Sequence, residues 1–125
     1  MKSKKTETNK QIKIKPIAKR YKYFEVDLVG IKFALKSKKE FQKAMIQTEV
    51  GCRLKLIHEP TNKYDPNAIA VYFKGVKLGY ISKNNNKKIL AIAQKGHTIN
   101  AVLTTDMIHH YLHMGNIGNK IMCMY

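Results

Sequence analysis

The sequence predicts a mainly β, α+β fold: a small OB-like antiparallel β-barrel with two short helices. Several short segments alternate apolar and polar residues with the two-residue period of strands, and two segments have the apolar spacing of helices. The connections between the strand segments are mostly too short for the crossovers that parallel strands require. We therefore expect antiparallel pairing and a small, partly closed barrel.

The composition limits the number of domains and the class of partner. A chain of 125 residues with 44% hydrophobic content has room for one domain with a modest core. Its formal charge of +16, from 24 basic and 8 acidic residues, favours a polyanionic partner, and nucleic acid is the leading class. The alternative is a lysine-rich protein whose charge serves only solubility.

The two cysteines and the hydropathy indicate the compartment. Cys52 and Cys123 are far apart and lack CxxC spacing, so the sequence indicates neither a disulfide framework nor a zinc site. No window of about 20 apolar residues predicts a membrane span, and the N-terminal region lacks the apolar segment of a signal peptide. We expect a cytoplasmic protein in a reducing compartment, without membrane association.

Residues 1–21 are polar and lysine-rich, with almost nothing to bury, and are expected to form a flexible basic arm ahead of a domain at 22–125. The domain is predicted to begin with a strand at 23–33. The inward face of this strand is expected to be Phe24, Val26 and Leu28. Gly30 is expected to bend the strand at a barrel corner.

A short helix is predicted next, because Ser37 and Glu40 have the spacing of a capping box. The apolar residues at helical spacing are Phe41, Ala44 and Met45. This helix is expected to end near Gly51, and a strand follows at 53–58. The inward residues of that strand are expected to be Leu54 and Leu56.

Residues 68–81 have the pattern of a β-hairpin. Two apolar alternating segments, 68–73 and 76–81, flank a tight turn at Lys74 and Gly75. The apolar face of the first segment is Ile69, Val71 and Phe73.

A second helix is predicted at 84–94, with an asparagine as its N-cap and Gly96 behind it. Its buried stripe is expected to be Ile89, Ile92 and Ala93. A strand is predicted at 98–107, an irregular segment at 109–118 and a closing strand at 120–125.

The segment 59–67 is the polar loop that joins the strand at 53–58 to the hairpin. Pro60 and Pro66 restrict its backbone, and its Asn and Asp residues favour Asx turns, in which the side chain accepts from a nearby backbone N–H. A rigid loop on a scaffold is a typical location for binding residues.

The sequence gives no support for an enzyme. It has no local Ser/His/Asp or Cys/His signature, no P-loop and no paired-carboxylate motif. His109, His110 and His113 include an i, i+4 pair, but no HExxH glutamate and no neighbouring Cys or Asp completes a zinc site. We expect no catalytic residue, no metal and no cofactor.

A binding site is the better-supported hypothesis. Tyr64 and Phe33 offer flat faces for bases. The lysines that offer charge to phosphates are Lys32, Lys63 and Lys83. Asp65 repels phosphate but can accept from a sugar hydroxyl, which favours a strand end over an internal phosphodiester. The alternatives are structural: Tyr64 packs on the loop, Phe33 belongs to the core, and the lysines form a solvated face. The corresponding alternative for Asp65 is a purely structural role, in which it caps the backbone of Asn67.

Three runs of the sequence together resemble a HIRAN domain of the small stand-alone bacterial type. They are residues 28–33, 56–71 and 75–83. The most specific feature is the combination of Glu-Pro-x-Asn-x-Tyr-Asp-x-Asn-Ala at 59–68 with the later Gly-Tyr. The resemblance covers roughly residues 24–105.

The resemblance implies an OB-like fold and a non-enzymatic module that captures the 3′-hydroxyl end of single-stranded DNA, with a role in DNA repair or replication. The end pocket implied by the motif consists of Asn62, Tyr64 and Asp65. In this pocket Asp65 is expected near the terminal 3′-hydroxyl. The basic–aromatic pair after the first glycine corresponds to Lys32 and Phe33, and the basic residue after the Gly-Tyr strand to Lys83. A protein-interaction adaptor and a general basic RNA-binding domain stay open as alternatives.

Overall fold

The structure is a computed structural model that describes residues 20–30, 38–105 and 119–125. Its strands are β2 (Tyr23–Val29), β3 (Arg53–His58), β4 (Ile69–Phe73), β5 (Val76–Ile81), β6 (Asn100–Leu103) and β7 (Lys120–Met124). Its helices are α2 (Lys38–Gln47) and α3 (Lys83–Gln94). None of these helices is long and apolar enough to cross a membrane.

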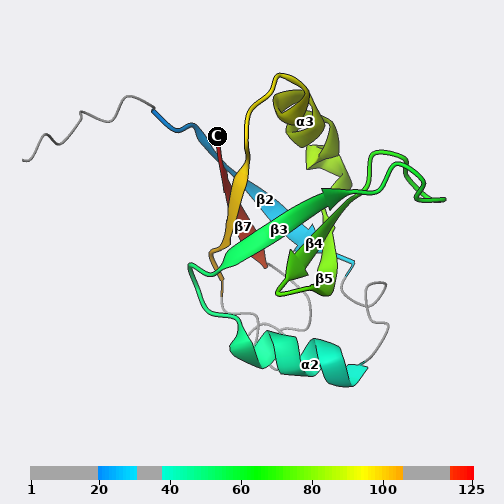
Figure 1. Cartoon of the computed structure of the whole chain (residues 1–125), viewed down its shortest axis with the longest axis vertical. Coiled ribbons are helices and arrows are strands. Elements are labelled where there is room, and N and C mark those ends of the chain that lie inside the picture. Colours follow the sequence, from blue (N-terminus) through cyan, green and yellow to red (C-terminus); the bar gives the residue numbers. More distant parts are fainter. Residues whose placement is uncertain (1–19, 31–37, 106–118) are drawn as a thin grey trace, which may run out of the picture.

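The described strands form a closed antiparallel barrel in the order β2-β5-β4-β3-β6-β7. The last strand, β7, pairs with both β2 and β6 and so closes the barrel, as the sequence predicts. The two helices lie at opposite ends of the barrel, α3 at the top and α2 at the bottom of Figure 1. The predicted fold class is confirmed, and the barrel is closed where a partly closed one is expected.

The core lies inside the barrel and follows the strand alternation. In β2, Val26 and Leu28 are buried and Phe24 is half-buried, on the face that the sequence predicts. The fully buried residues of other strands include Val71, Leu78, Leu103 and Ile121. At one end α2 buries its predicted apolar residues, Phe41, Ala44 and Met45. Apolar burial from every strand and α2 therefore contributes to one core.

Two predictions for α3 are wrong. The helix begins at Lys83 with Ser82 as N-cap, where an asparagine cap is expected, and Ser82 makes no side-chain capping hydrogen bond. The buried face of α3 is Asn86, Ile89 and Ile92. This three-residue spacing leaves Ala93 exposed. A polar residue occupies the buried position because it has a hydrogen-bond partner on the neighbouring loop, described below.

Some predicted strand limits also differ. β2 ends at Val29, because Gly30 adopts the left-handed backbone conformation, with φ of 66°. β6 covers residues 100–103, within the predicted 98–107. Several predictions lie outside the described residues. They concern most of the basic arm (1–19), Lys32, Phe33, the Ser37 cap, and the segment 109–118 with His109, His110 and His113.

A β-bulge between β4 and β5 changes which side chains of β5 share a face. Val71 lies opposite Gly79, whereas the next residue, Tyr72, lies opposite Lys77. Residues three apart in a regular strand point to opposite faces, but one extra residue reverses the alternation. Lys77 and Tyr80 consequently reach the same side, where Lys77 Nζ donates to the Tyr80 hydroxyl at 3.1 Å.

We expect Leu103→Ala to lower the free energy of unfolding by about 2–5 kcal/mol, because truncation of this 0% exposed side chain leaves a cavity in the barrel. Urea unfolding followed by circular dichroism measures the change. Ile46→Ala is a matched control on α2, where the side chain is 67% exposed, and should cost less than about 0.5 kcal/mol. Equal losses in the two variants would contradict this core assignment.

Candidate nucleic-acid interface

The β3–β4 loop is a tightly hydrogen-bonded projection from the barrel, beside the start of α3 (Figure 1). At its base the Glu59 N–H donates to the Ala68 carbonyl at 2.8 Å, which extends the β3–β4 pairing by one residue. Two turns follow, because the Asn62 N–H donates to the Glu59 carbonyl at 3.0 Å and the Ala68 N–H to the Asp65 carbonyl at 3.0 Å. These contacts give the loop a defined backbone.

Asx turns fix the tip of the loop, as predicted. Asn62 Oδ1 accepts from the backbone N–H groups of Tyr64 and Asp65, at 2.9 and 3.1 Å. Asp65 Oδ1 in turn accepts from the N–H of Asn67 at 2.8 Å. Side-chain acceptors of this kind hold a turn that no strand or helix supports. The directions in which Tyr64 and Asp65 leave the backbone are therefore set by Asn62.

Glu59 accepts three hydrogen bonds, one from within the loop and two from β5. Its Oε1 accepts from Asn62 Nδ2 at 3.0 Å and from the Tyr80 hydroxyl at 3.1 Å. Its Oε2 accepts from Lys77 Nζ at 2.7 Å, a charge-assisted contact. One carboxylate thus orients the asparagine that shapes the loop and the tyrosine on the adjacent strand.

The protonation of the Glu59–Lys77 pair follows from this network. Partial burial by itself raises the pKa of Glu59, but the hydrogen bonds from Lys77 and Asn62 and the charge of Lys77 outweigh it and lower that pKa below 4.5. Burial likewise opposes the charge of Lys77, whose hydrogen bonds to Glu59 and Tyr80 nevertheless raise its pKa above 10.5. Both groups are therefore ionised at neutral pH.

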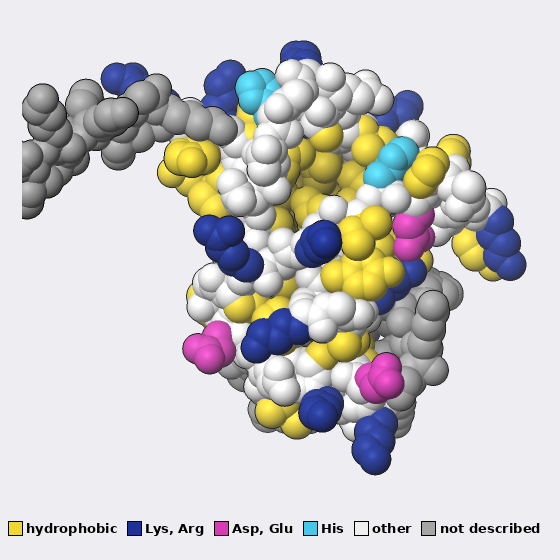
Figure 2. Space-filling model, viewed as in Figure 1, with side chains coloured by type: hydrophobic (Ala, Val, Ile, Leu, Met, Phe, Trp, Pro, Cys, Tyr) yellow, Lys and Arg dark blue, Asp and Glu magenta, His cyan; other side chains and the backbone are white. Residues whose placement is uncertain are grey.

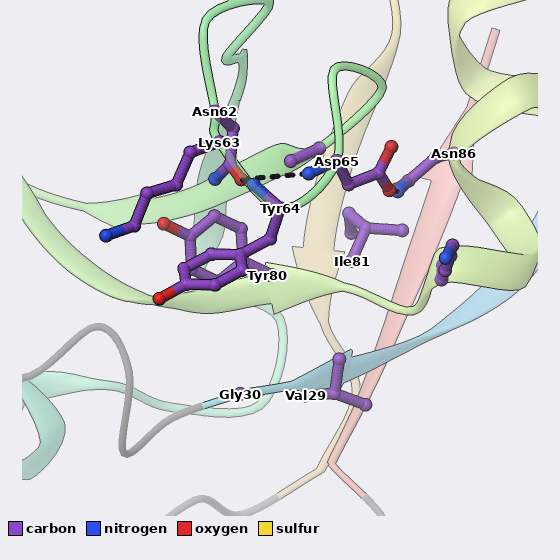
Figure 3. Close-up of a pocket in the computed structure, with 11 residues that line it drawn as sticks. Val29, Gly30, Asn62, Lys63, Tyr64, Asp65, Tyr80, Ile81 and Asn86 are labelled. Atoms are coloured by element: carbon purple, nitrogen blue, oxygen red, sulfur yellow. Dashed lines mark hydrogen bonds between the residues drawn. The ribbon is translucent and has the colours of Figure 1, made fainter.

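A pocket of about 860 Å³ lies between the loop, the end of β2, β5 and the start of α3. It brings together five of the predicted site residues, Asn62, Lys63, Tyr64, Asp65 and Lys83. Apolar side chains including Val29 and Ile81 also line it. Figure 3 shows Asn62, Lys63, Tyr64 and Asp65 on the loop, with Tyr80 on the adjacent strand. The other two predicted residues, Lys32 and Phe33, lie outside the described residues.

Tyr64 does not pack on the loop. Its side chain is 82% exposed, and the ammonium group of Lys63 lies 5.1 Å from the centre of its ring. Tyr80 is instead anchored at its hydroxyl by Glu59 and Lys77, and the Lys77 ammonium lies 5.1 Å from the centre of the Tyr80 ring. The pocket therefore combines one accessible aromatic ring with one fixed aromatic ring.

Asp65 both caps the backbone of Asn67 and lines the pocket. Its second oxygen, Oδ2, accepts from Asn86 Nδ2 of α3 at 3.1 Å. Asn86 is 3% exposed, so the contact joins the loop to the buried face of α3. Each carboxylate oxygen accepts one hydrogen bond from the protein and keeps capacity for a second. Asp65 is thus an oriented acceptor with room for a ligand donor.

The sequence did not identify four residues of this arrangement: Glu59, Lys77, Tyr80 and Asn86. Glu59 and Tyr80 belong to the motif residues that support the family resemblance, so the motif itself was the available signal. Lys77 carries no sequence signal, because a bulge brings it to the site. Asn86 lies three residues before Ile89, on the buried stripe of α3, and this spacing was the available signal for it.

The rest of the described surface is rich in positive charge. Figure 2 shows dark blue Lys and Arg side chains spread over this face of the molecule, with fewer magenta acidic side chains. Within residues 20–30, 38–105 and 119–125, no three His, Cys, Asp or Glu side chains are grouped to hold a metal. Burial raises the pKa of Cys123 to about 11, so this thiol stays protonated at neutral pH.

Comparisons with known proteins give a family and two similar folds. The sequence model of the HIRAN domain matches residues 21–110. No curated protein matches the chain. A crystal structure of a protein from Lactobacillus plantarum is 22% identical, with a TM-score of 0.64 over 84% of this chain and 96% of that chain. The HIRAN domain of human HLTF is 16% identical, with a TM-score of 0.61 over 82% of this chain and 73% of that chain. At these identities the two structures support the fold.

We expect Glu59→Gln to destabilise the protein by about 1–2 kcal/mol at pH 7, because it removes the charge from a network of three hydrogen bonds. The folded-state pKa of Glu59 lies below 4.5, so its contribution is present above pH 4.5 and is lost as pH falls through the folded pKa. The difference in melting temperature between wild type and variant should therefore shrink at low pH.

Thermal unfolding of both proteins across that range checks this prediction. Glu49→Gln is the matched control, because Glu49 is an exposed glutamate outside the pocket, and it should change stability by less than about 0.5 kcal/mol. A gap between wild type and Glu59→Gln that persists undiminished in acid would show that the charge of Glu59 does not stabilise the network.

Proposed function

Because this chain belongs to the HIRAN domain family, we propose that it is a non-enzymatic module that captures the 3′-hydroxyl end of single-stranded DNA. The family is one of nucleic-acid-binding modules, which supports nucleic acid as the partner. The observation that carries the finer proposal is the pocket, in which an exposed aromatic ring, an oriented carboxylate and lysines lie together. We propose DNA repair or replication as its setting.

The terminal base stacks on Tyr64. This ring is 82% exposed on a loop whose backbone is held by Asn62, so little ordering is needed when a base arrives. Stacking on an aromatic side chain contributes about 1–3 kcal/mol per base. Tyr80, held at its hydroxyl, supplies the fixed wall of the same pocket.

The terminal sugar donates its 3′-hydroxyl to Asp65. Both carboxylate oxygens have unused acceptor capacity, and their orientation is set by Asn67 and Asn86. A phosphate at the same place would meet the negative charge of the carboxylate. This difference favours a free 3′-hydroxyl end over a 3′-phosphate or an internal phosphodiester.

The phosphate that precedes the terminal nucleotide is bound by Lys63 and Lys83. Lys83 is the first residue of α3, and the first turn of that helix contains no acidic residue. The N-terminus of a helix is favourable for an anion, because its backbone N–H groups and its dipole point outward. Lys32 and Phe33 are proposed as further contacts on the family motif, and the formal charge of +16 attracts the strand over longer distances.

Fluorescence anisotropy with three DNA oligonucleotides of one sequence tests end capture. We expect the strand with a 3′-hydroxyl to bind about tenfold more tightly than the strand with a 3′-phosphate, the equivalent of about 1.4 kcal/mol. A circular strand without ends should bind as weakly as the 3′-phosphate. Equal affinity for all three would refute end capture. Incubation of the same DNA with magnesium is expected to give no cleavage.

We expect Tyr64→Ala to weaken binding of the 3′-hydroxyl strand by about 5- to 150-fold, because one stacked base is lost. Asp65→Asn should act differently: it should reduce the preference for the hydroxyl over the phosphate. Tyr23→Ala is the matched control, since Tyr23 is 62% exposed and does not line the pocket. If Tyr64→Ala has no effect and every nucleic acid dissociates at moderate salt, the protein-interaction adaptor becomes the better hypothesis.

A further inference from the structure

The orientation of the Asn86 amide is determined by Asp65. Asn86 Nδ2 lies 3.1 Å from Asp65 Oδ2. Since a carboxylate only accepts hydrogen bonds, the amide nitrogen must be the atom that faces Asp65. The amide oxygen, Oδ1, cannot bond to Asp65, and it has no hydrogen-bond partner in the part of the chain that the structure describes. A buried acceptor without a partner costs free energy, which a ligand donor would recover.

Asp65 and Asn86 therefore form a group of acceptors with unused capacity on one side of the pocket. The two oxygens of Asp65 each accept one hydrogen bond from the protein. Both residues line the pocket. The Asn86 oxygen is itself buried, so a donor on a ligand can meet it only if the amide rotates toward the pocket. A matching ligand presents two adjacent donors and no negative charge.

The sugar of a terminal nucleotide carries donors of this kind. In Figure 3 the rings of Tyr64 and Tyr80 lie on one side of the Asp65 side chain, and Asn86 lies on the other. A base stacked on the rings is therefore directed away from Asn86, and the sugar that carries it lies at Asp65. Ribose has neighbouring 2′- and 3′-hydroxyls, both of which can donate, and an acidic side chain is a known type of partner for a ribose hydroxyl. Deoxyribose has the 3′-hydroxyl alone.

We infer that Asp65 and Asn86 together bind the 2′,3′-diol of a terminal ribose, so that the pocket prefers a strand ending in a ribonucleotide over an all-deoxy strand. This inference rests on the proposed capture of a 3′-hydroxyl end and specifies the sugar at that end. The 2′-hydroxyl is the group by which a protein distinguishes RNA from DNA at a given position. Asn86 is then a specificity-determining residue, and Asp65 accepts from the diol.

Anisotropy with the unmodified protein tests the inference. The ligands are one DNA oligonucleotide with three different last nucleotides: deoxyuridine, uridine and 2′-O-methyluridine, each with a free 3′-hydroxyl. The uridine end is expected to bind about 5- to 10-fold more tightly than the deoxyuridine end. This is the gain expected when the 2′-hydroxyl makes one more hydrogen bond to a charged or buried acceptor. The 2′-O-methyluridine end should bind no more tightly than the deoxyuridine end, because its methylated 2′-oxygen cannot donate a hydrogen bond.

Variants assign the preference to Asn86. Asn86→Leu keeps the approximate size of the side chain and removes the amide, and it should abolish the difference between the uridine and deoxyuridine ends. Asn84→Ala is the matched control, an exposed asparagine of the same helix that does not line the pocket, and it should keep the difference. Thermal unfolding checks that both variants are folded. If Asn86→Leu does not fold, the oligonucleotide series on the unmodified protein still tests whether the pocket prefers a ribonucleotide end.

The outcomes separate this inference from the proposed function. Equal affinity for uridine and deoxyuridine ends, with a weaker 3′-phosphate end, overturns diol recognition and leaves end capture in place. Equal affinity for hydroxyl and phosphate ends removes end capture itself. Competition by free uridine 5′-monophosphate distinguishes two sources of the diol. Competition would support recognition of the diol in a free ribonucleotide, and its absence together with a retained uridine preference would support a strand end.

Discussion

The pocket depends on the carboxylate of Glu59. Its two oxygens accept three hydrogen bonds, from Asn62, Tyr80 and Lys77, within 2.7–3.1 Å. Asn62 uses its amide nitrogen for this contact and its oxygen for the backbone of the loop tip. A single charged group therefore determines both the shape of the loop and the orientation of the tyrosine opposite it. Lys77 makes this arrangement stable, because its positive charge compensates the partial burial of the carboxylate.

The barrel makes the Glu59 network possible through an irregularity in its sheet. In a regular β5, Lys77 and Tyr80 would point to opposite faces, and Glu59 could not meet both. The bulge opposite Val71 brings the two side chains together. Bulges are frequent next to binding sites for this reason, since they redirect a side chain without interrupting the sheet. In this protein the bulge turns an ordinary hairpin strand into one wall of a pocket.

The sequence predicts the parts of this structure that depend on local patterns. Alternation identified the buried faces of the strands, such as Val26 and Leu28 in β2, because one side of each strand must be apolar. The Asx turns at Asn62 and Asp65 were predictable for a similar reason, since their hydrogen bonds connect residues two or three positions apart. The helix limits of α3 were less accurate, because Ser82 and several asparagines are all acceptable caps.

The parts that the sequence did not predict depend on contacts between distant residues. Asn86 lies three residues before Ile89, on the buried stripe of α3, but the presence of a polar residue there is explained only by a partner 21 positions away, Asp65. Lys77 resembles any surface lysine of a hairpin until a bulge places it beside Glu59. Periodicity cannot reveal such pairs, because the energy that favours them arises after the chain has folded. Five of the predicted site residues nevertheless meet in one pocket. Four of them belong to a loop with a local structure of its own, and the fifth, Lys83, begins α3 beside it.

The two carboxylates of the pocket have different electrostatic surroundings, and this difference bears on selectivity. Glu59 is paired with Lys77, so its charge is compensated within the protein. Asp65 accepts from two neutral donors, the Asn67 N–H and the Asn86 amide, and no ion pair to it is found among the described residues. An uncompensated carboxylate is a strong acceptor for a hydroxyl and repels a phosphate. A protein with a charge of +16 attracts any nucleic acid along its length, so a preference for a strand end requires a local charge of the opposite sign. Asp65, held in place by Asn67 and Asn86, is the side chain that would supply that charge in the proposed end capture.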